Sequence, residues 1–198
     1  MPELEGRKNV QAIWRWFEAQ CIRGCKIIIT VSPAIAELLS RNYHVNDVQL
    51  VRNVPQFSSD IVPFTKSEIG VDEGKGLLVF QGNGINRDRG GEELVEAMKI
   101  LDNCQLLIIG AGDVIPDLKK MVQTAGVEDK VTFIDTVPFD LLMRYTAAAD
   151  IGLSLDKDTN INYRYSLPNK VFDYAMAGTA VLAGDLPEVG KVIRDFKI

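Results

Sequence analysis

The chain has 198 residues, of which 46% are hydrophobic, 25% charged and 8% aromatic. These values are ordinary for a globular protein and exclude a disordered, collagen-like or low-complexity chain. The formal charge of −5 argues against a general nucleic-acid-binding protein, so no nucleic-acid partner is expected. The length suits one domain with an extension, or two small lobes.

The sequence shows no membrane span, no secretory signal and no metal-binding spacing. The longest uninterrupted aliphatic run is 27–29, far short of the roughly 20 apolar residues that a spanning helix needs. The opening residues 1–5 are acidic, unlike a secretory signal. We therefore expect a cytoplasmic protein in a reducing setting. Three cysteines and the single His44 do not match a zinc site, so no metal is expected.

The first quarter of the chain predicts two helices and two strands. Apolar residues recur at helical spacing from Val10 to Cys21. The β-branched run at 26–31 is typical of a buried parallel strand. Ser32 and a following proline predict a helix to about residue 43, and a strand is expected at 48–54. The first helix is locally basic and carries both tryptophans, so it is expected to pack against another lobe, with peripheral membrane contact as the alternative.

The rest of the chain alternates strand and helix signals. Proline, glycine and serine gather at 55–75, and we place a linker at 59–75. The alternation beyond it predicts an α/β fold: a Rossmann-like parallel sheet with helices on both faces. Ligands of such sheets bind at the carboxyl ends of the strands. Strands are expected at 77–81, 105–109, 131–134, 151–155 and 181–183. Helices are expected at 92–101, from the loop at 110–113 to about 124, from 138 to about 148, at 168–178 and from 187 onward.

A glycine-rich loop at 82–91 follows the first of these strands. It holds four glycines and two arginines. Glycine lets backbone N–H groups approach an anion, and the helix start behind them adds partial positive charge. An arginine there can bind a phosphate through two hydrogen bonds. The alternative is a flexible surface turn with solvated charges.

The loop after the next strand partly matches a dinucleotide-binding fingerprint. Gly110 and Gly112 fit the pattern, and Asp135 ends a later strand near where a ribose-binding acid belongs. The third glycine is absent because Ile115 holds its place. The match also falls after the first strand–helix unit of the lobe. An NAD-dependent oxidoreductase is therefore one alternative, and a tight structural turn is another.

A third loop leads into the helix predicted from Pro168. A proline at the first helical position leaves the N–H groups of Asn169, Lys170 and Val171 unpaired. Asn169, Lys170 and Asp173 share one arc of this helix with a tyrosine, Tyr174. A cation, an amide and a carboxylate beside a helix start favour anion binding over a merely solvated face.

Six stretches together resemble a known family. They occur in the order "VSPAIAELL", "VRNVP", "FQGNGINRDRGGEELVEAM", "LLIIGAGD", "VTFIDTVPFDLLMRYTAAADIGLSL" and "SLPNKVFDYAMAGTAVLAGDLPEVG". This series resembles the group 1, or family 4, glycosyltransferases, retaining enzymes with two Rossmann-like lobes in the GT-B arrangement. The resemblance implies that 76–198 is the donor nucleotide-sugar-binding lobe, truncated at its C-terminus. Residues 1–58 would be the incomplete end of the acceptor-binding lobe.

The resemblance also implies roles for single residues. Arg89 stands where a basic residue contacts the donor diphosphate, and Lys170 with its helix start would take the same group. Members of the family often carry two glutamates in this last loop. Asp173 stands at the position of the second and would accept hydrogen bonds from the ribose hydroxyls, whereas Tyr165 stands at the position of the first. Arg89, Lys170 and Asp173 form the implied catalytic set. The implied donor-binding set is Gly82, Asn83, Gly84, Gly90, Gly112, Asp135, Thr136, Val137, Tyr165, Ser166, Leu167, Pro168 and Asn169, with the base near 135–137.

The expected reaction moves a sugar from a nucleoside-diphosphate sugar to an acceptor hydroxyl with retention, in polysaccharide or glycan biosynthesis. Positive groups would stabilise the departing diphosphate, so neither a metal nor another cofactor is expected. The acceptor, a glycan or a lipid-linked glycan, would bind the missing lobe, and the isolated fragment is expected to be inactive. Because Tyr165 supplies no carboxylate, a non-catalytic nucleotide-sugar-binding module is a further alternative. The whole interpretation requires the turns at 82–91 and 166–171 to meet at one pocket.

Overall fold

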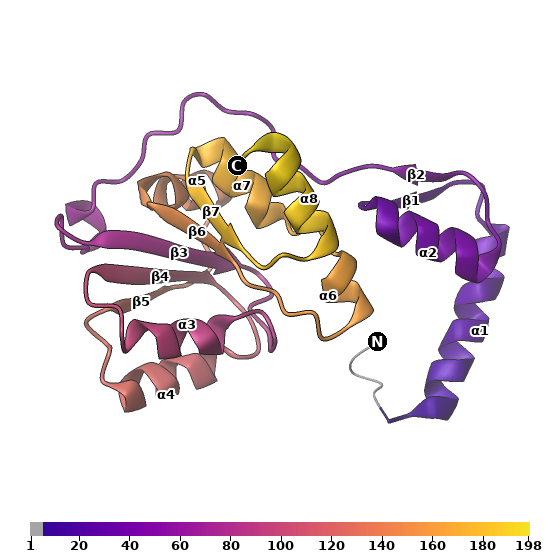
Figure 1. The fold of residues 1–198 in the computed structure, drawn as a ribbon, viewed down its shortest axis with the longest axis horizontal. Helices are drawn as coiled ribbons and strands as arrows, with labels where there is room; N and C mark the ends of the chain where they lie inside the picture. Colours follow the sequence, from indigo (N-terminus) through magenta and orange to yellow (C-terminus); the bar gives the residue numbers. More distant parts are fainter. Residues whose placement is uncertain (1–5) are drawn as a thin grey trace.

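A five-stranded parallel sheet forms the body of the molecule, in the order β5-β4-β3-β6-β7 (Figure 1). The structure is a computed structural model that describes residues 6–198, and the acidic opening at 1–5 lies outside the described residues. All pairings in the sheet are parallel, as expected. Its strands are β3 (Gly76–Gly82), β4 (Cys104–Gly110), β5 (Val131–Ile134), β6 (Ile151–Ser154) and β7 (Ala180–Ala183).

Helices cover both faces of this sheet. In β4, Leu106 and Ile108 join the core beneath one helix layer, and Leu107 and Ile109 join the core on the other face. Because both faces are buried, the central residues 106–109 of this strand are all apolar instead of alternating with polar ones. The predicted Rossmann-like class is confirmed. One layer holds α3 (Gly91–Met98) and α4 (Ile115–Ala125), and the other holds α5 (Phe139–Ala148), α7 (Asn169–Ala177) and, against α7, α8 (Pro187–Phe196).

The strand order reverses between β3 and β6. From β3 the chain continues outward to β4 and β5, and it then returns to place β6 on the other side of β3. Loops that leave the carboxyl ends of β3 and β6 therefore lie next to each other. This switch point is where open α/β sheets bind their ligands.

The N-terminal part contains α1 (Lys8–Gly24), β1 (Ile28–Thr30), α2 (Pro33–Tyr43) and β2 (Val48–Leu50). Its two strands pair in parallel with each other and form a separate small sheet. Within the described residues 6–58, Ser32 alone is buried. An extended segment then runs over the main sheet to a single 3-10 turn, η2 (Ser67–Ile69) (Figure 1). The division into 1–58, 59–75 and 76–198 remains a prediction.

Four elements differ from the sequence prediction. The strand expected at 26–31 spans Ile28–Thr30 and is not buried as expected, because it pairs with the short strand β2 in a separate small sheet and Ile29 is 58% exposed. The strand expected at 48–54 ends at Leu50, and the N–H of Val51 makes the last hydrogen bond to Thr30, at 2.9 Å. The helix after the glycine-rich loop ends at Met98 instead of 101. The polar loop after β6 contains a short helix, α6 (Ile161–Tyr165), whose first turn is capped by the side chain of Asn160.

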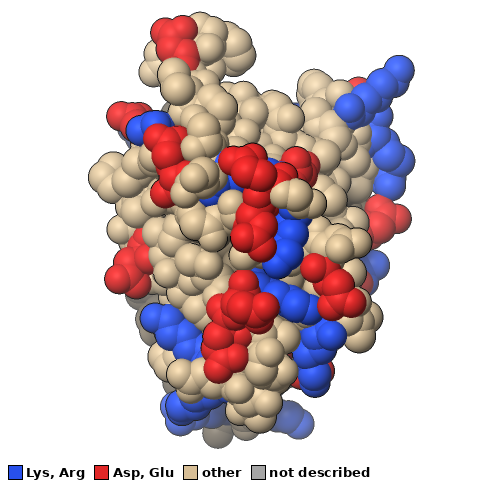
Figure 2. Space-filling view, turned by 90° about the vertical axis from the view of Figure 1, so that its left-hand side faces the viewer, with Lys and Arg blue, Asp and Glu red and all other residues tan. Residues whose placement is uncertain are grey.

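The opposite end of the sheet, at the strands' amino ends, carries charges of both signs side by side (Figure 2). Three ion pairs lie just before the strands, where opposite charges neutralise each other locally. The nitrogen–oxygen distances are 3.1 Å for Lys66–Asp150, 2.8 Å for Lys75–Asp72 and 2.9 Å for Lys130–Asp102. Among the helices in the described part of the chain, none is long and apolar enough to cross a membrane.

Candidate functional site

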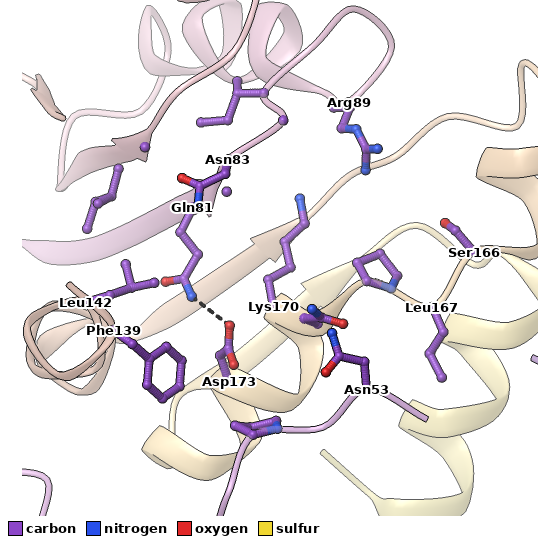
Figure 3. Close-up of a pocket in the computed structure, with 18 of the residues that line it drawn as sticks. Asn53, Gln81, Asn83, Arg89, Phe139, Leu142, Ser166, Leu167, Lys170 and Asp173 are labelled. Carbon is purple, nitrogen blue, oxygen red and sulfur yellow. Dashed lines mark hydrogen bonds between the residues drawn. The ribbon is translucent and has the colours of Figure 1, made fainter. Parts of the chain in front are cut away.

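A cavity of about 670 Å³ lies at the carboxyl ends of β3 and β4, a volume that suits a small-molecule ligand. Its walls include the turn at 82–85, the segment after β5 at 136–142, the start of α7 at 166–170, and N-terminal residues such as Val31 and 53–55. The two turns that were expected to meet therefore line one cavity (Figure 3).

Arg89 and Lys170 meet on the carboxylate of Asp156. Arg89 Nη1 donates to Asp156 Oδ1 at 2.7 Å, and Lys170 Nζ lies 3.9 Å from Oδ2. The Asp156 side chain is 2% exposed and that of Lys170 10%. Two cations against one carboxylate leave an excess of positive charge at this end of the cavity, toward which both cationic head groups extend (Figure 3). Such an excess attracts an anionic ligand.

Gly90 explains why Arg89 can reach Asp156. Its φ of 91° lies in the left-handed region, and a Cβ there would lie 2.4 Å from the Leu155 Cβ. Only glycine allows the turn to approach the end of β6 so closely. The N–H of Lys157 also donates to the carbonyl of Asp88 at 2.9 Å, which fixes the turn against the strand end.

Aromatic rings flank both cations. The Arg89 guanidinium lies 4.7 Å from the ring centre of Tyr163, and the Lys170 ammonium lies 4.8 Å from that of Phe80. Burial and the neighbouring Arg89 lower the pKa of Lys170, whereas Asp156 acts in the opposite direction. Asp156 is therefore the anion that favours the charged form of a buried lysine.

Asp173 lies on the other side of Lys170 and is held by a neutral partner. Gln81 Nε2 donates to Asp173 Oδ2 at 3.3 Å (Figure 3), and the Thr146 hydroxyl lies 2.7 Å from Gln81 Oε1. Burial raises the pKa of Asp173 to about 6, although the hydrogen bond from Gln81 opposes the rise. A buried carboxyl with a raised pKa in a cavity indicates a functional group.

The start of α7 differs from the prediction by one residue. Pro168 caps the helix with extended backbone, and the helix itself begins at Asn169. The N–H of Val171, which was expected to be unpaired, donates to the Pro168 carbonyl at 3.2 Å. Tyr174, expected on the polar arc, is fully buried, and its hydroxyl donates to the Leu153 carbonyl at 3.0 Å. The polar group on the cavity side is therefore Asn169, Lys170 and Asp173.

Of the sixteen residues that the resemblance implies as catalytic or donor-binding, twelve line this cavity and four do not. The residues that line it are Arg89, Lys170, Asp173, Gly82, Asn83, Gly84, Thr136, Val137, Ser166, Leu167, Pro168 and Asn169. Gly90, Gly112, Asp135 and Tyr165 lie outside its wall. Asp135 is exposed at the end of β5. The Tyr165 carbonyl accepts a hydrogen bond from the Ser32 hydroxyl at 2.9 Å, so α6 contacts the N-terminal part.

The two glycines of the partial dinucleotide fingerprint pack against the first turn. A Cβ on Gly112 would lie 2.1 Å from the Ile85 carbonyl oxygen, and one on Gly110 would lie 2.0 Å from that of Gly82. The N–H of Ala111 donates to the Gly82 carbonyl at 3.1 Å. Close backbone packing therefore accounts for both glycines without a dinucleotide, which favours the tight structural turn.

Sequence reasoning missed Asp156, Gln81 and Asn53. Asp156 directly follows a strand that was predicted as buried, and a charged residue at the carboxyl end of such a strand was a usable signal. Asn53 lies beside the start of α7 although it comes from the segment after β2 (Figure 3). No sequence pattern indicated that contact. Among residues 6–198, no three His, Cys, Asp or Glu side chains are grouped so that they could hold a metal ion.

The chain belongs to the group 1 glycosyl transferases, because the model of the family described as "Glycosyl transferases group 1" matches residues 75–197. A curated relative, the D-inositol 3-phosphate glycosyltransferase of Arthrobacter sp. (strain FB24), is 29% identical over 191 residues, which cover 90% of this chain and 44% of the relative. This chain thus spans less than half the length of that relative.

Solved glycosyltransferase structures share the fold. Sucrose-phosphate synthase from Thermosynechococcus elongatus aligns with a TM-score of 0.69 at 20% identity, over 87% of this chain and 45% of that one. Anabaena Alr3699/HepE, solved in complex with UDP and glucose, aligns with a TM-score of 0.68 at 13% identity, over 86% of this chain and 47% of that one. The family and the GT-B fold, of which this chain contains the C-terminal lobe, are as the sequence resemblance implied.

Proposed function

We propose that this chain is the donor-binding part of a retaining glycosyltransferase that transfers a sugar from a nucleoside-diphosphate sugar to an acceptor hydroxyl. The main support is the convergence of Arg89 and Lys170 at one end of a cavity that two amide-rich turns also line. That arrangement suits a diphosphate, which carries its charge on two adjacent groups. The complex of HepE with UDP and glucose is in line with such a ligand.

The proposed mechanism stabilises the leaving group. When the bond between the sugar and the diphosphate breaks, negative charge builds up on the diphosphate and the sugar becomes oxocarbenium-like. We assign the stabilisation of that charge to Arg89, Lys170 and the turn at 82–84, which line the same cavity, so little reorganisation is needed during the reaction. The chemistry assigned to these residues needs no metal or other cofactor.

The rest of the cavity suits the remainder of the donor. Asp173, Thr136, Val137 and Phe139 line the same cavity. We assign Asp173 to accept hydrogen bonds from the ribose hydroxyls and the other three residues to contact the base. We assign the acceptor, a glycan or lipid-linked glycan, to the part of the relatives that this chain does not span. We further propose that the reaction is cytoplasmic and serves polysaccharide or glycan synthesis, with peripheral contact of α1 with the membrane as one way to reach a lipid-linked acceptor.

A thermal-shift panel tests donor binding on the chain itself. We expect one of the UDP, GDP or ADP sugars to raise the melting temperature, because a ligand at about 100 times its Kd stabilises the folded state by about 2.7 kcal/mol. NAD is expected to have no effect. A shift with NAD alone would instead favour the oxidoreductase. Donor binding by the complete protein without any transfer would favour the non-catalytic module.

Removal of either cation tests the assigned roles. In the complete enzyme, Arg89→Ala or Lys170→Ala is expected to lower kcat about 100- to 1,000-fold, as loss of one preorganised donor commonly does. Arg87→Ala is the matched control, because Arg87 lies in the same turn but is exposed and does not line the cavity. Steady-state kinetics of the three variants decide the question, and near-normal rates in both cavity variants refute the assignment.

A further inference from the structure

One buried carboxylate supports both cations of the cavity, and its contacts are incomplete. Asp156 Oδ1 accepts from Arg89, whereas Oδ2 accepts no hydrogen bond and faces Lys170 across 3.9 Å. Arg89 Nε is also buried without a hydrogen-bond partner. Buried polar atoms without hydrogen-bond partners are rare because they destabilise the fold, and those that persist often lie at functional sites.

The two cations need an anion between them if they are to stay together. Arginine and lysine have long side chains with many rotamers, and like charges repel more strongly where water is excluded. The rings of Tyr163 and Phe80 restrict each cation from one side. Among the described residues, Asp156 is the acidic side chain that forms an ion pair with both.

We infer that Asp156 is a positioning residue: its two carboxylate oxygens hold the Arg89 guanidinium and the Lys170 ammonium side by side and keep both directed at one diphosphate. The inference rests on the proposed function. Asp156 itself does not line the cavity, so it acts through the two cations and not on the ligand. Neither the family match nor the resemblance assigned it a role, because the family's first glutamate corresponds to Tyr165.

Loss of the Asp156 carboxylate is expected to change how ligand binding depends on pH. The charged groups around Lys170 are Asp156 after β6, Arg89 before α3, and Asp173 on α7 itself. Burial and Arg89 favour the neutral amine, and Asp156 favours the ammonium. An opposite charge at this distance shifts a pKa by about one to three units. Without the carboxylate, the pKa of Lys170 is lower still, so the ammonium loses its proton earlier as the pH rises. Anion binding therefore begins to weaken at a lower pH than in the wild type.

The test is the pH dependence of UDP, GDP and ADP binding to the whole chain, measured by isothermal titration calorimetry at pH 6.5, 7.5 and 8.5. For the nucleotide that binds best, Asp156→Asn is expected to weaken binding about tenfold or more at pH 8.5, since one pKa unit corresponds to tenfold, and less at pH 6.5. Asp156→Glu keeps the charge and is expected to restore most of the affinity. In a Lys170→Ala background, Asp156→Asn is expected to lose its pH-dependent effect.

Controls separate positioning from folding and from the proposed function. Asp158→Asn removes one negative charge from the same loop at a residue paired with Arg164 instead, and is expected to bind like the wild type. Asp156→Ser provides a second neutral variant, and circular dichroism shows which variants fold. Binding by a folded neutral variant that equals or exceeds the wild type at every pH overturns the positioning role alone. Absence of binding by the wild type to all three nucleotides overturns the proposed function, and the inference with it.

Discussion

At the scale of single residues, two aspartates lie in different surroundings: Asp173 lines the cavity, and Asp156 lies behind the two cations at its end. Asp156 forms ion pairs with two cations, whereas the one side-chain hydrogen bond recorded for Asp173 comes from the neutral amide of Gln81. A buried carboxylate with a neutral partner is costly to ionise, and its pKa accordingly rises to about 6. The folded protein therefore keeps a proton on Asp173 at pH values where the unfolded chain has lost it.

That difference predicts how stability changes with pH. Between pH 4 and pH 6 the native state binds more protons at Asp173 than the unfolded state, so the contribution of Asp173 to the free energy of unfolding falls as pH rises. Above about pH 6 this unfavourable contribution is constant. Asp173→Asn removes the cost. We expect the ligand-free variant to be about 2 kcal/mol more stable than the wild type at pH 7.5 and nearly equal to it at pH 4. Urea unfolding at a series of pH values measures the difference.

Asp150→Asn is a control of the opposite sign. The N–H of Leu77 and the ammonium of Lys66 lower the pKa of Asp150. The ionised Asp150 side chain therefore stabilises the folded protein above its ordinary pKa, and this stabilisation is lost as pH falls. We expect Asp150→Asn to destabilise the protein at neutral pH. A stability difference for Asp173→Asn that does not change between pH 4 and pH 7.5 would contradict the burial argument.

Arg89, Lys170 and Asp173 could be selected from the sequence because each sits in a local pattern: Arg89 precedes the glycines at a helix start, and Lys170 and Asp173 share one arc of a predicted helix. Asp156 could not be assigned its role in the same way. Its position after a strand was visible, but its partners are 67 residues away in one direction and 14 in the other. Ion pairs between distant segments depend on the strand order, which the local pattern does not contain.

At the scale of elements, glycines determine how closely the turns approach the sheet. Gly90 combines a positive φ with contact against Leu155, whereas Gly126 has a positive φ in open space. Gly84 has neither constraint, although it belongs to the same turn as Gly90. The three positions therefore separate backbone strain from steric overlap.

We expect the three alanine substitutions to differ in a graded way. Gly90→Ala is expected to lower the free energy of unfolding by about 2–4 kcal/mol, because strain at positive φ and overpacking add. Gly126→Ala carries the backbone strain alone and is expected to cost about 1 kcal/mol. Gly84→Ala is expected to be near neutral. Denaturant unfolding gives all three values, and equal effects at positions 84 and 90 would show that the turn does not need its close approach to Leu155.

The centre of the main sheet was predictable because it contains a continuous aliphatic run that is buried on both faces, Leu106–Ile109. The short helix α6 was not predictable. It has five residues, mostly polar, and too few turns to show a helical period. Its stability comes from the Asn160 cap and from its contact with Ser32, and the second of these is tertiary.

At the scale of the whole molecule, the N-terminal part has little core of its own. Trp16, Ile29 and Val51 are 64%, 58% and 56% exposed, in contrast to the buried strands of the main sheet. The curated relative and sucrose-phosphate synthase are each more than twice as long as the region that aligns with this chain. Its position against the main domain depends on a few contacts near the start of α2.

Two hydrogen bonds connect the start of α2 to the main domain. Glu188, on α8 and 7% exposed, accepts from the N–H of Ala34 at 3.1 Å, and the Ser32 hydroxyl donates to Tyr165. A carboxylate at a helix N-terminus is favourable, and a hydrogen bond to a charged group contributes about 1.5–3 kcal/mol. Glu188→Gln keeps the shape and removes the charge. We therefore expect amide hydrogens of α2 to exchange about tenfold faster in this variant, with β3 and β4 unchanged.

Hydrogen–deuterium exchange mass spectrometry measures both regions in one experiment. Ser32→Ala removes the helix cap and the contact with α6 together, so it is expected to speed exchange in α2 further. Glu73→Gln, at an exposed position before β3, serves as the control for a change of net charge. If exchange in α2 is the same in Glu188→Gln and in the control, the charge of Glu188 does not hold the N-terminal part in place. The cavity wall at Val31 and 53–55 would then depend on contacts other than this one.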